Sequence, residues 1–260
     1  IPWVILAVLV ILFRDAGYVY RIREITDRHL TWKRSIYVII LWEFASAVTP
    51  SVVGGTAVAI FILNKEGIKL GKAYSLYASY SIVMAAALFY RPRVFKWVLI
   101  KIFSIKWLRK WKHDADEYGN QIIEASRELS GKKLNYWLPI ILATIFIWSS
   151  RYLMLNALIS AFVPLAAFEH VIVFARQVIM WIVMMISPTP GSSGTAEFFF
   201  GQFFTEFLNN YTFVTSILWR LLSYYPYLIL GAFFLPRWVK QVFFKKKKNK
   251  INPEQDVSGS

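Results

Sequence analysis

Residues 186–200 read ISPTPGSSGTAEFFF, and this stretch decides the fold because it interrupts an otherwise apolar chain. An apolar run over residues 168–187 leads into it, and a second over residues 196–208 follows it. Proline removes a backbone donor and clashes with the preceding helical turn, while glycine frees the backbone, so we expect a broken helix here. At membrane depth a broken backbone is tolerated only where protein buries it or where it lines a cavity.

A second copy of the break lies earlier in the chain. Residues 49–57, TPSVVGGTA, align with residues 189–196, TPGSSGTA, with one additional glycine in the first copy. Each copy follows an apolar helix that contains a tryptophan, Trp42 or Trp181. A single such cluster would favour a mere packing role, since proline and glycine are common in membrane helices. Two matching copies instead favour a binding site between structural repeats.

The composition indicates that lipid is the solvent for most of the chain. Of the 260 residues, 57% are hydrophobic and only 17% are charged, and the mean hydropathy is +0.46. Soluble proteins carry about 25% charged residues. The chain has no cysteine, and its three histidines lack the spacing of metal ligands, so we expect neither metal nor cofactor. The sequence therefore predicts an all-α, polytopic helical membrane protein.

Apolar runs mark the candidate spans, because about 20 helical residues cross a hydrocarbon core about 30 Å thick. The chain begins abruptly inside such a run and has no basic leader, so we expect its first residues to belong to a longer first helix. The complete or partial runs cover residues 1–13, 35–48, 52–63, 73–90, 136–163, 168–187, 196–208 and 211–235.

The basic residues predict the orientation, because lysine and arginine near span ends stay on the cytoplasmic side. The connectors over residues 164–170 and 205–211 carry none and should face outward. We therefore expect a multi-pass protein of a bacterial-type cytoplasmic (inner) membrane with a cytoplasmic C-terminus. The net charge of +15 adds attraction to anionic lipids rather than to nucleic acid, and it leaves the oligomeric state open. Most lysines and arginines lie in residues 14–34, 65–72, 91–133 and 237–250.

These sides predict two inverted repeats, each with a re-entrant helix hairpin whose tip is one of the breaks. The second repeat closes, but the first has a single apolar run between the basic residues near 72 and 91. Either residues 35–63 form one kinked span, or a segment near residues 78–81 is missing, and we favour the missing segment. We expect a transmembrane domain over residues 1–236, followed by a disordered basic cytoplasmic tail over residues 237–260. Within the transmembrane domain, repeat one covers about residues 1–90, a cytoplasmic interfacial connector about 91–135, and repeat two about 136–236.

The half-helix after each break should bind an anion, because it presents unpaired N–H groups and the positive end of its dipole. Nearby hydroxyl groups would donate to phosphate oxygens. We expect Arg176 to pair with Glu197 or to act as counter-charge to a lipid phosphate. Glu197 itself, in the first turn after the break, fits a helix cap as well as it fits substrate contact or proton coupling. The predicted substrate-binding residues are Thr49, Pro50, Ser51, Gly54, Gly55, Thr56, Arg176, Thr189, Pro190, Gly191, Ser192, Ser193, Gly194, Thr195 and Glu197.

Three further ionisable residues within apolar runs are weaker candidates, since each costs about 2.5 to 3.5 kcal/mol on insertion. They are Glu43, Arg151 and Arg220. The two arginines would also reach an interface by extending their side chains. Glu43 is the acidic counterpart in the first repeat, and we expect it to pair with an arginine.

The quoted stretch at residues 186–200 resembles a signature of the lysylphosphatidylglycerol synthase/flippase transmembrane family. Residues 46–68, SAVTPSVVGGTAVAIFILNKEGI, resemble that family's other broken-helix motif. The resemblance covers roughly residues 30–235 and implies a helical, flippase-like protein with its site between the two motifs. The family usually has a further span after the first motif. This sequence lacks the soluble aminoacyl-transferase domain, so we expect a lipid to be moved here and made elsewhere.

The leading hypothesis is a flippase that moves an anionic, phosphate-bearing lipid, either a phospholipid or a polyprenyl phosphate, between leaflets. The head group would bind at the two breaks while one repeat rocks against the other. Such a protein is not an enzyme. One alternative is an enzyme acting on a lipid phosphate or a glycosyl lipid, although its candidate carboxylates Asp114, Asp116 and Glu117 fit solvated surface charge. The other alternative is a lipid-binding scaffold without transport.

Overall fold

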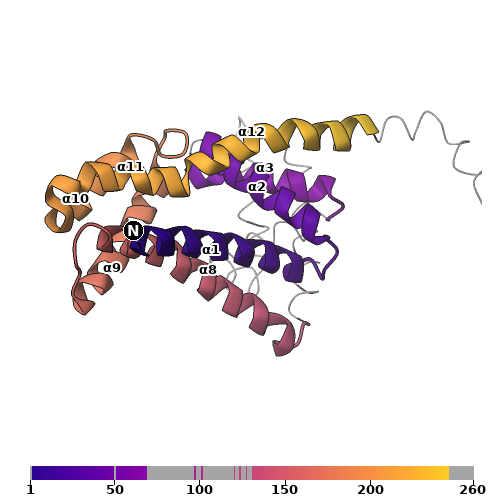
Figure 1. Cartoon of the computed structure of the whole chain (residues 1–260). Coiled ribbons are helices and arrows are strands. Elements are labelled where there is room, and N and C mark those ends of the chain that lie inside the picture. Colours follow the sequence, from indigo (N-terminus) through magenta and orange to yellow (C-terminus); the bar gives the residue numbers. More distant parts are fainter. Residues whose placement is uncertain are drawn as a thin grey trace, which may run out of the picture.

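The computed structural model describes residues 2–49, 51–68, 97, 101, 120, 123, 127 and 131–245. The run expected over residues 73–90, the site expected for a missing segment near residues 78–81 and most of the connector over residues 91–135 lie outside the described residues. Within the described ranges every element is a helix, which confirms the predicted all-α class (Figure 1). In chain order the elements are α1 (Pro2–Ile25), α2 (Trp32–Val48), α3 (Ser51–Lys65), α8 (Leu134–Ser160), α9 (Ala167–Ile186), α10 (Thr195–Leu208), η2 (Asn209–Tyr211), α11 (Thr212–Ser223), α12 (Tyr225–Val239) and the π-helical η3 (Lys240–Lys245).

Four of the described helical stretches are long and apolar enough to cross a membrane: α1, α8, α9 and the continuous stretch Thr195–Phe243. Large apolar side chains point outward from them, and Ile186, at 80% exposure, is the extreme case. Soluble proteins rarely expose wide apolar surfaces, whereas lipid favours them. The prediction of a polytopic helical membrane protein is confirmed.

Helices α1 and α8 pack along each other (Figure 1). We expected the first apolar run to end at residue 13, because Arg14 follows it, but α1 continues to Ile25. Arg14 is buried, with 3% of its surface exposed, so it belongs to the packed face and does not mark the membrane boundary. The buried positions of α1 recur every three to four residues, as one helix face requires: Ala7, Ile11, Arg14, Tyr18, Arg21, Ile22 and Ile25.

Helices α2 and α3 form a hairpin around the first break. Thr49 is extended, with φ −99° and ψ 146°, because the residue before a proline is kept out of the helical region. Gly55 allows close packing, since a Cβ atom there would lie 2.7 Å from the Ser46 Cα. An ion pair between Arg34 and Glu66 ties the start of α2 to the end of α3. The break separates two antiparallel helices, as the sequence predicts.

The second break separates α9 from α10, close to the predicted bounds. A third break was not predicted: the run over residues 211–235 divides into α11 and α12 at Tyr224, where φ is −129° and ψ is −59°. Pro226 explains it, because proline is tolerated in the first turn of a helix but not in its interior.

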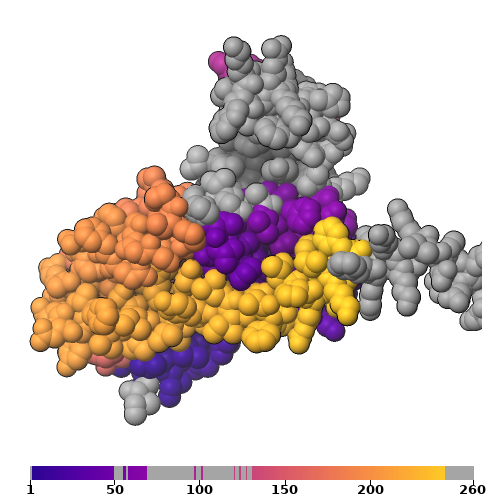
Figure 2. All heavy atoms as spheres, turned by 90° about the horizontal axis from the view of Figure 1, so that it is seen from above, coloured from indigo at the N-terminus to yellow at the C-terminus, as the bar shows by residue number. Residues whose placement is uncertain are grey.

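Helical structure continues beyond the tail boundary predicted at residue 237. Helix α12 runs through Trp238, and η3 continues to Lys245. Trp238 is 3% exposed, and its Nε1 donates to Glu66 at 2.8 Å, so this end of α12 is packed against α3. Figure 2 shows α3 and α12 on the same face of the molecule. Residues 246–260 lie outside the described residues.

The molecule has two ends, and the breaks lie between them (Figure 1). One end, here called the basic end, holds the ion pair between Lys132 and Asp27 at 3.0 Å and the ion pair between Arg34 and Glu66. At the opposite end, the rings of Phe162 and Tyr211 stack with centroids 5.3 Å apart. Hairpin α2–α3 opens toward the basic end, and hairpin α9–α10 opens toward the opposite end.

Candidate functional site

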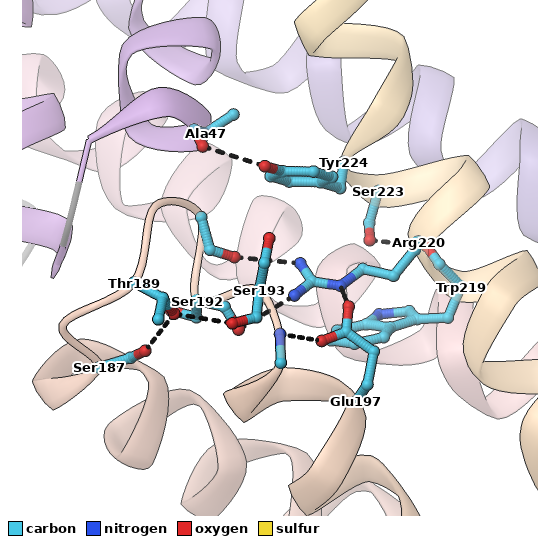
Figure 3. A network of polar contacts seen from close by, with 12 residues as sticks. Ala47, Ser187, Thr189, Ser192, Ser193, Glu197, Trp219, Arg220, Ser223 and Tyr224 are labelled. Carbon is cyan, nitrogen blue, oxygen red and sulfur yellow. Dashed lines mark hydrogen bonds and ion pairs between the residues drawn. The ribbon is translucent and has the colours of Figure 1, made fainter.

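The two breaks meet in the middle of the molecule (Figure 3). The Gly191 backbone N–H donates to the Thr49 carbonyl at 3.4 Å. The Tyr224 hydroxyl donates to the Ala47 carbonyl at 3.1 Å, so the third break joins the same contact. Gly191 has φ +56°, and a Cβ atom there would lie 2.7 Å from the Ala47 carbonyl oxygen and would overlap the Tyr224 ring. Only glycine fits this close approach.

A cavity of about 160 Å³ lies at the meeting point. Thr49 of the first break and Gly191 and Ser192 of the second break all line it. The remaining lining comes from α1, α2, α8, α9, α11 and α12. Pockets for whole small molecules measure about 300–1,000 Å³. This cavity therefore suits one charged group of a larger molecule.

One arginine organises the second break. Arg220 on α11 is 6% exposed and donates from Nε to the Glu197 carboxylate at 2.6 Å. Its two terminal nitrogens donate to the carbonyls of Gly191 and Ser192, both at 3.2 Å (Figure 3). Glu197 also accepts from the Gly194 N–H at 2.6 Å. The carboxylate of Glu197 therefore caps the start of α10, where the sequence alone suggested an open anion site.

The hydroxyl groups of the second break stabilise the loop itself. Ser187 donates to Thr195 Oγ1 at 3.0 Å, and Thr189 donates to the Ser193 carbonyl at 2.8 Å. Ser192 donates to the Met184 carbonyl at 3.0 Å. Gly194 and Ser193 are exposed, and the cavity lining includes neither of them. Of the predicted residues of this break, Gly191 and Ser192 reach the cavity.

The first break contributes Thr49, whose hydroxyl donates to the Ala45 carbonyl at 2.6 Å while its backbone meets Gly191. Gly55 and Thr56 are buried in the α2–α3 hairpin. Pro50 and the side chain of Ser51 lie outside the described residues, and Gly54 lies within α3.

Arg176 does not reach the cavity lining. It donates to the Phe203 carbonyl at 2.6 Å and to the Glu206 carboxylate at 2.5 Å. The expectation that Arg176 pairs with Glu197 is wrong, because Arg220 holds that carboxylate. In an antiparallel hairpin, residues equally far from the tip lie opposite each other, so the partner of Arg176 lies near the far end of α10.

Sequence reasoning missed a charged cluster at the cavity, to which α1 and α12 contribute. Arg14 donates from Nε to Asp15 Oδ1 at 3.0 Å and also to the Tyr227 hydroxyl. The Tyr227 hydroxyl in turn donates to Asp15 Oδ2 at 2.6 Å. By its place at the start of a basic segment, Arg14 is predicted to be a cytoplasmic residue, whereas the structure buries it. Its helical spacing from Ile11 and Tyr18 was the signal that could have placed it on a buried face.

Two of the weaker candidates, Glu43 and Arg151, also line the cavity. In the part of the chain that the structure describes, neither has a hydrogen-bond or ion-pair partner, so the pairing expected for Glu43 is not made at contact distance. The Arg151 guanidinium lies 5.8 Å from the centre of the Trp148 ring. Both groups therefore face the cavity with hydrogen-bonding capacity to spare.

The charges around the cavity are nearly balanced. Asp15 offsets Arg14, and Glu197 offsets Arg220. Arg151 remains, and Glu43 is the one carboxylate among the described lining residues. Charge-assisted hydrogen bonds are strong where water is scarce. The arrangement can therefore bind an anionic group at Arg151 between walls held by Arg14 and Arg220.

These features define a polytopic helical membrane protein with a charged central cavity. The chain belongs to the family described as the lysylphosphatidylglycerol synthase TM region, whose model matches residues 75–231 and so includes the second break. A UPF0104 membrane protein of Archaeoglobus fulgidus is 23% identical over 249 residues, which cover 78% of this chain and 75% of the relative. No solved structure matches. The predicted family resemblance is confirmed.

Proposed function

We propose that the protein moves an anionic, phosphate-bearing membrane lipid, a phospholipid or a polyprenyl phosphate, from one leaflet to the other. The observation that supports this proposal is the central cavity, which both breaks line together with Arg14, Arg151 and Arg220. The family membership, a transmembrane region named after lipid chemistry, is consistent with a lipid substrate. In this proposal the protein transports the lipid and performs no reaction on it.

Within the proposal, Arg151 receives the phosphate. Its guanidinium is the one in the described lining that no carboxylate pairs with, and it can present two parallel donors to phosphate oxygens. Arg14 stays paired with Asp15 and Arg220 with Glu197, and these pairs stabilise the helices that line the cavity. The small volume of the cavity admits the phosphate, while the acyl or prenyl chains stay in the surrounding lipid.

We further propose that the two hairpins are inverted re-entrant repeats. Hairpin α2–α3 opens at the basic end, and the positive-inside rule supports a cytoplasmic position for that end in a bacterial-type inner membrane. Hairpin α9–α10 opens at the opposite end, whose connectors lack lysine and arginine. Rocking of one repeat against the other would separate the tips and expose the cavity to each side in turn.

A vesicle assay with Arg151→Gln tests the proposal. The purified protein is reconstituted with a fluorescent phosphatidylglycerol, and an impermeant quencher reports which leaflet holds the probe. Loss of a charge-assisted hydrogen bond costs about 1.5–3 kcal/mol, so we expect the variant to bind and move the probe at least about tenfold less well. Arg28→Gln is the matched control, because Arg28 is exposed, lies after the end of α1 and away from the cavity lining, and pairs with Glu24 at 3.0 Å.

An unchanged rate in Arg151→Gln would contradict the assignment of the phosphate site. Two other results would replace the function itself. Probe that binds the protein but never changes leaflet would indicate a scaffold, and release of phosphate from the probe would indicate an enzyme.

A further inference from the structure

We propose that binding of the anionic head group in the cavity is coupled to uptake of one proton by Glu43. This inference rests on the proposed function, and it names the energy source that the site can use. It begins from the position of Glu43, an ionisable group on α2 that faces the cavity and has no hydrogen-bond or ion-pair partner among the residues that the structure describes.

The charged groups that act on Glu43 come from α1 and α8. Helix α1 presents Arg14, Asp15 and Arg21, and α8 presents Arg151. Helix α12 presents the Tyr227 hydroxyl, and α11 contributes Arg220 to the same cavity. On α3, the described charged residue is Lys65, which lies in the last turn at the basic end.

The two other carboxylates near the cavity already accept several hydrogen bonds each. Asp15 accepts hydrogen bonds from Arg14 and from the Tyr227 hydroxyl. Glu197 accepts from Arg220 and from the Gly194 N–H at the start of α10. A proton on either would remove acceptors from these donors, whereas a proton on Glu43 breaks no hydrogen bond.

Charge balance then links the phosphate to the proton. With Glu43 ionised, the charges of the lining residues Arg14, Arg151, Arg220 and Glu43 and of the two carboxylates paired with them, Asp15 and Glu197, sum to zero; Arg21 is not part of the lining. A phosphate monoanion would add one negative charge in a region of low polarity, and an uncompensated buried charge is strongly unfavourable. A proton on Glu43 restores the balance and frees Arg151 for the phosphate. Because such coupling is reciprocal, the phosphate must strengthen proton binding as much as the proton strengthens phosphate binding.

The consequence for transport is a neutral cargo. One phosphate charge and one proton cross together, so a pH gradient drives the lipid, and the membrane potential neither drives nor opposes it. Entry of the head group from the acidic side and its release on the alkaline side is the favoured direction.

Calorimetry on the purified full chain tests the coupling directly. The probe is glycerophosphoglycerol, a phosphodiester head group whose single charge does not titrate in the range used. Binding heats measured in two buffers of different ionisation enthalpy give the number of protons taken up. For the unaltered protein we expect one proton per probe at neutral pH, and an affinity that falls about tenfold per pH unit as the pH rises.

Glu43→Gln keeps the shape and removes the titrating group. We expect it to bind the probe without proton uptake and with an affinity that no longer changes with pH. Glu24→Gln is the matched control, since Glu24 lies at the basic end in a pair with Arg28, and it should behave as the unaltered protein does.

The outcomes separate the two proposals. Binding by the unaltered protein without proton uptake at any pH overturns the coupling and leaves the proposed function standing. Uptake that persists in Glu43→Gln also overturns it, because another group would then carry the proton. If the unaltered protein neither binds the probe nor moves labelled lipid, the proposed function fails and the coupling fails with it. A Glu43→Gln variant that does not fold leaves the decision to the proton count of the unaltered protein.

Discussion

At the scale of single residues, Arg220 shows why an arginine holds the second break. One planar guanidinium reaches the Glu197 carboxylate and two backbone carbonyls of the loop at the same time. A lysine ammonium is a compact charge and cannot match three acceptors spread around a plane. Gly191 is the other residue on which the break depends, because its backbone contacts Thr49 and its missing side chain makes room for Tyr224.

A comparison of two glycines tests this dependence. Gly191→Ala introduces strain at φ +56° and a clash with Tyr224 and Ala47, so we expect a loss of more than about 2 kcal/mol of stability and loss of lipid movement. Gly194→Ala meets no atom within 4 Å, so its cost comes from backbone strain at φ +81° alone, and we expect the smaller loss. Thermal unfolding in detergent gives the order of the two, and equal losses would refute the close contact.

At the scale of elements, the breaks were predictable because their causes are local. Proline and glycine act on their own helix, so the ends of α2, α3, α9 and α10 lie close to the expected residues. Helix α1 was cut short, since a lone arginine looks like a membrane boundary until its buried partners are known. The break at Tyr224 was overlooked although Pro226 signals it.

The partners within the site depended on tertiary structure. Arg176 and Arg220 both lie in apolar sequence, and nothing local decides which of them meets Glu197. The antiparallel pairing of α9 with α10 settles the matter. The contact between Arg14 and Tyr227 also depends on tertiary structure, because the two residues are far apart in the chain and meet in a hydrogen-bond network around Asp15.

The α2–α3 hairpin offers a test at this scale. Gly55→Ala would place a methyl group 2.7 Å from the Ser46 Cα and push the two helices apart, at a cost of about 1–3 kcal/mol. Gly201→Ala, within α10, meets nothing within 4 Å and should gain up to about 1 kcal/mol from better helix propensity. Unfolding temperatures of opposite sign relative to the unaltered protein are expected. A neutral Gly55→Ala would mean that the two helices are not in close contact.

At the scale of the whole molecule, two hairpins open toward opposite ends, and their tips meet in the middle. The contact between Thr49 and Gly191 closes one side of the cavity that holds Arg151 and Glu43. Movement of a head group past this point requires the tips to separate. The account therefore predicts that the tips are the moving parts of the transport cycle.

The most direct test links the two tips reversibly and follows lipid movement. The chain has no cysteine, so Thr49→Cys and Ser192→Cys together provide the only thiols for a short, cleavable cross-linker. In reconstituted vesicles, we predict that labelled phosphatidylglycerol changes leaflet with the unlinked double variant, stops when the tips are joined and resumes after the linker is cleaved. Movement no faster than in protein-free vesicles, or movement that continues while the tips are joined, would contradict the account.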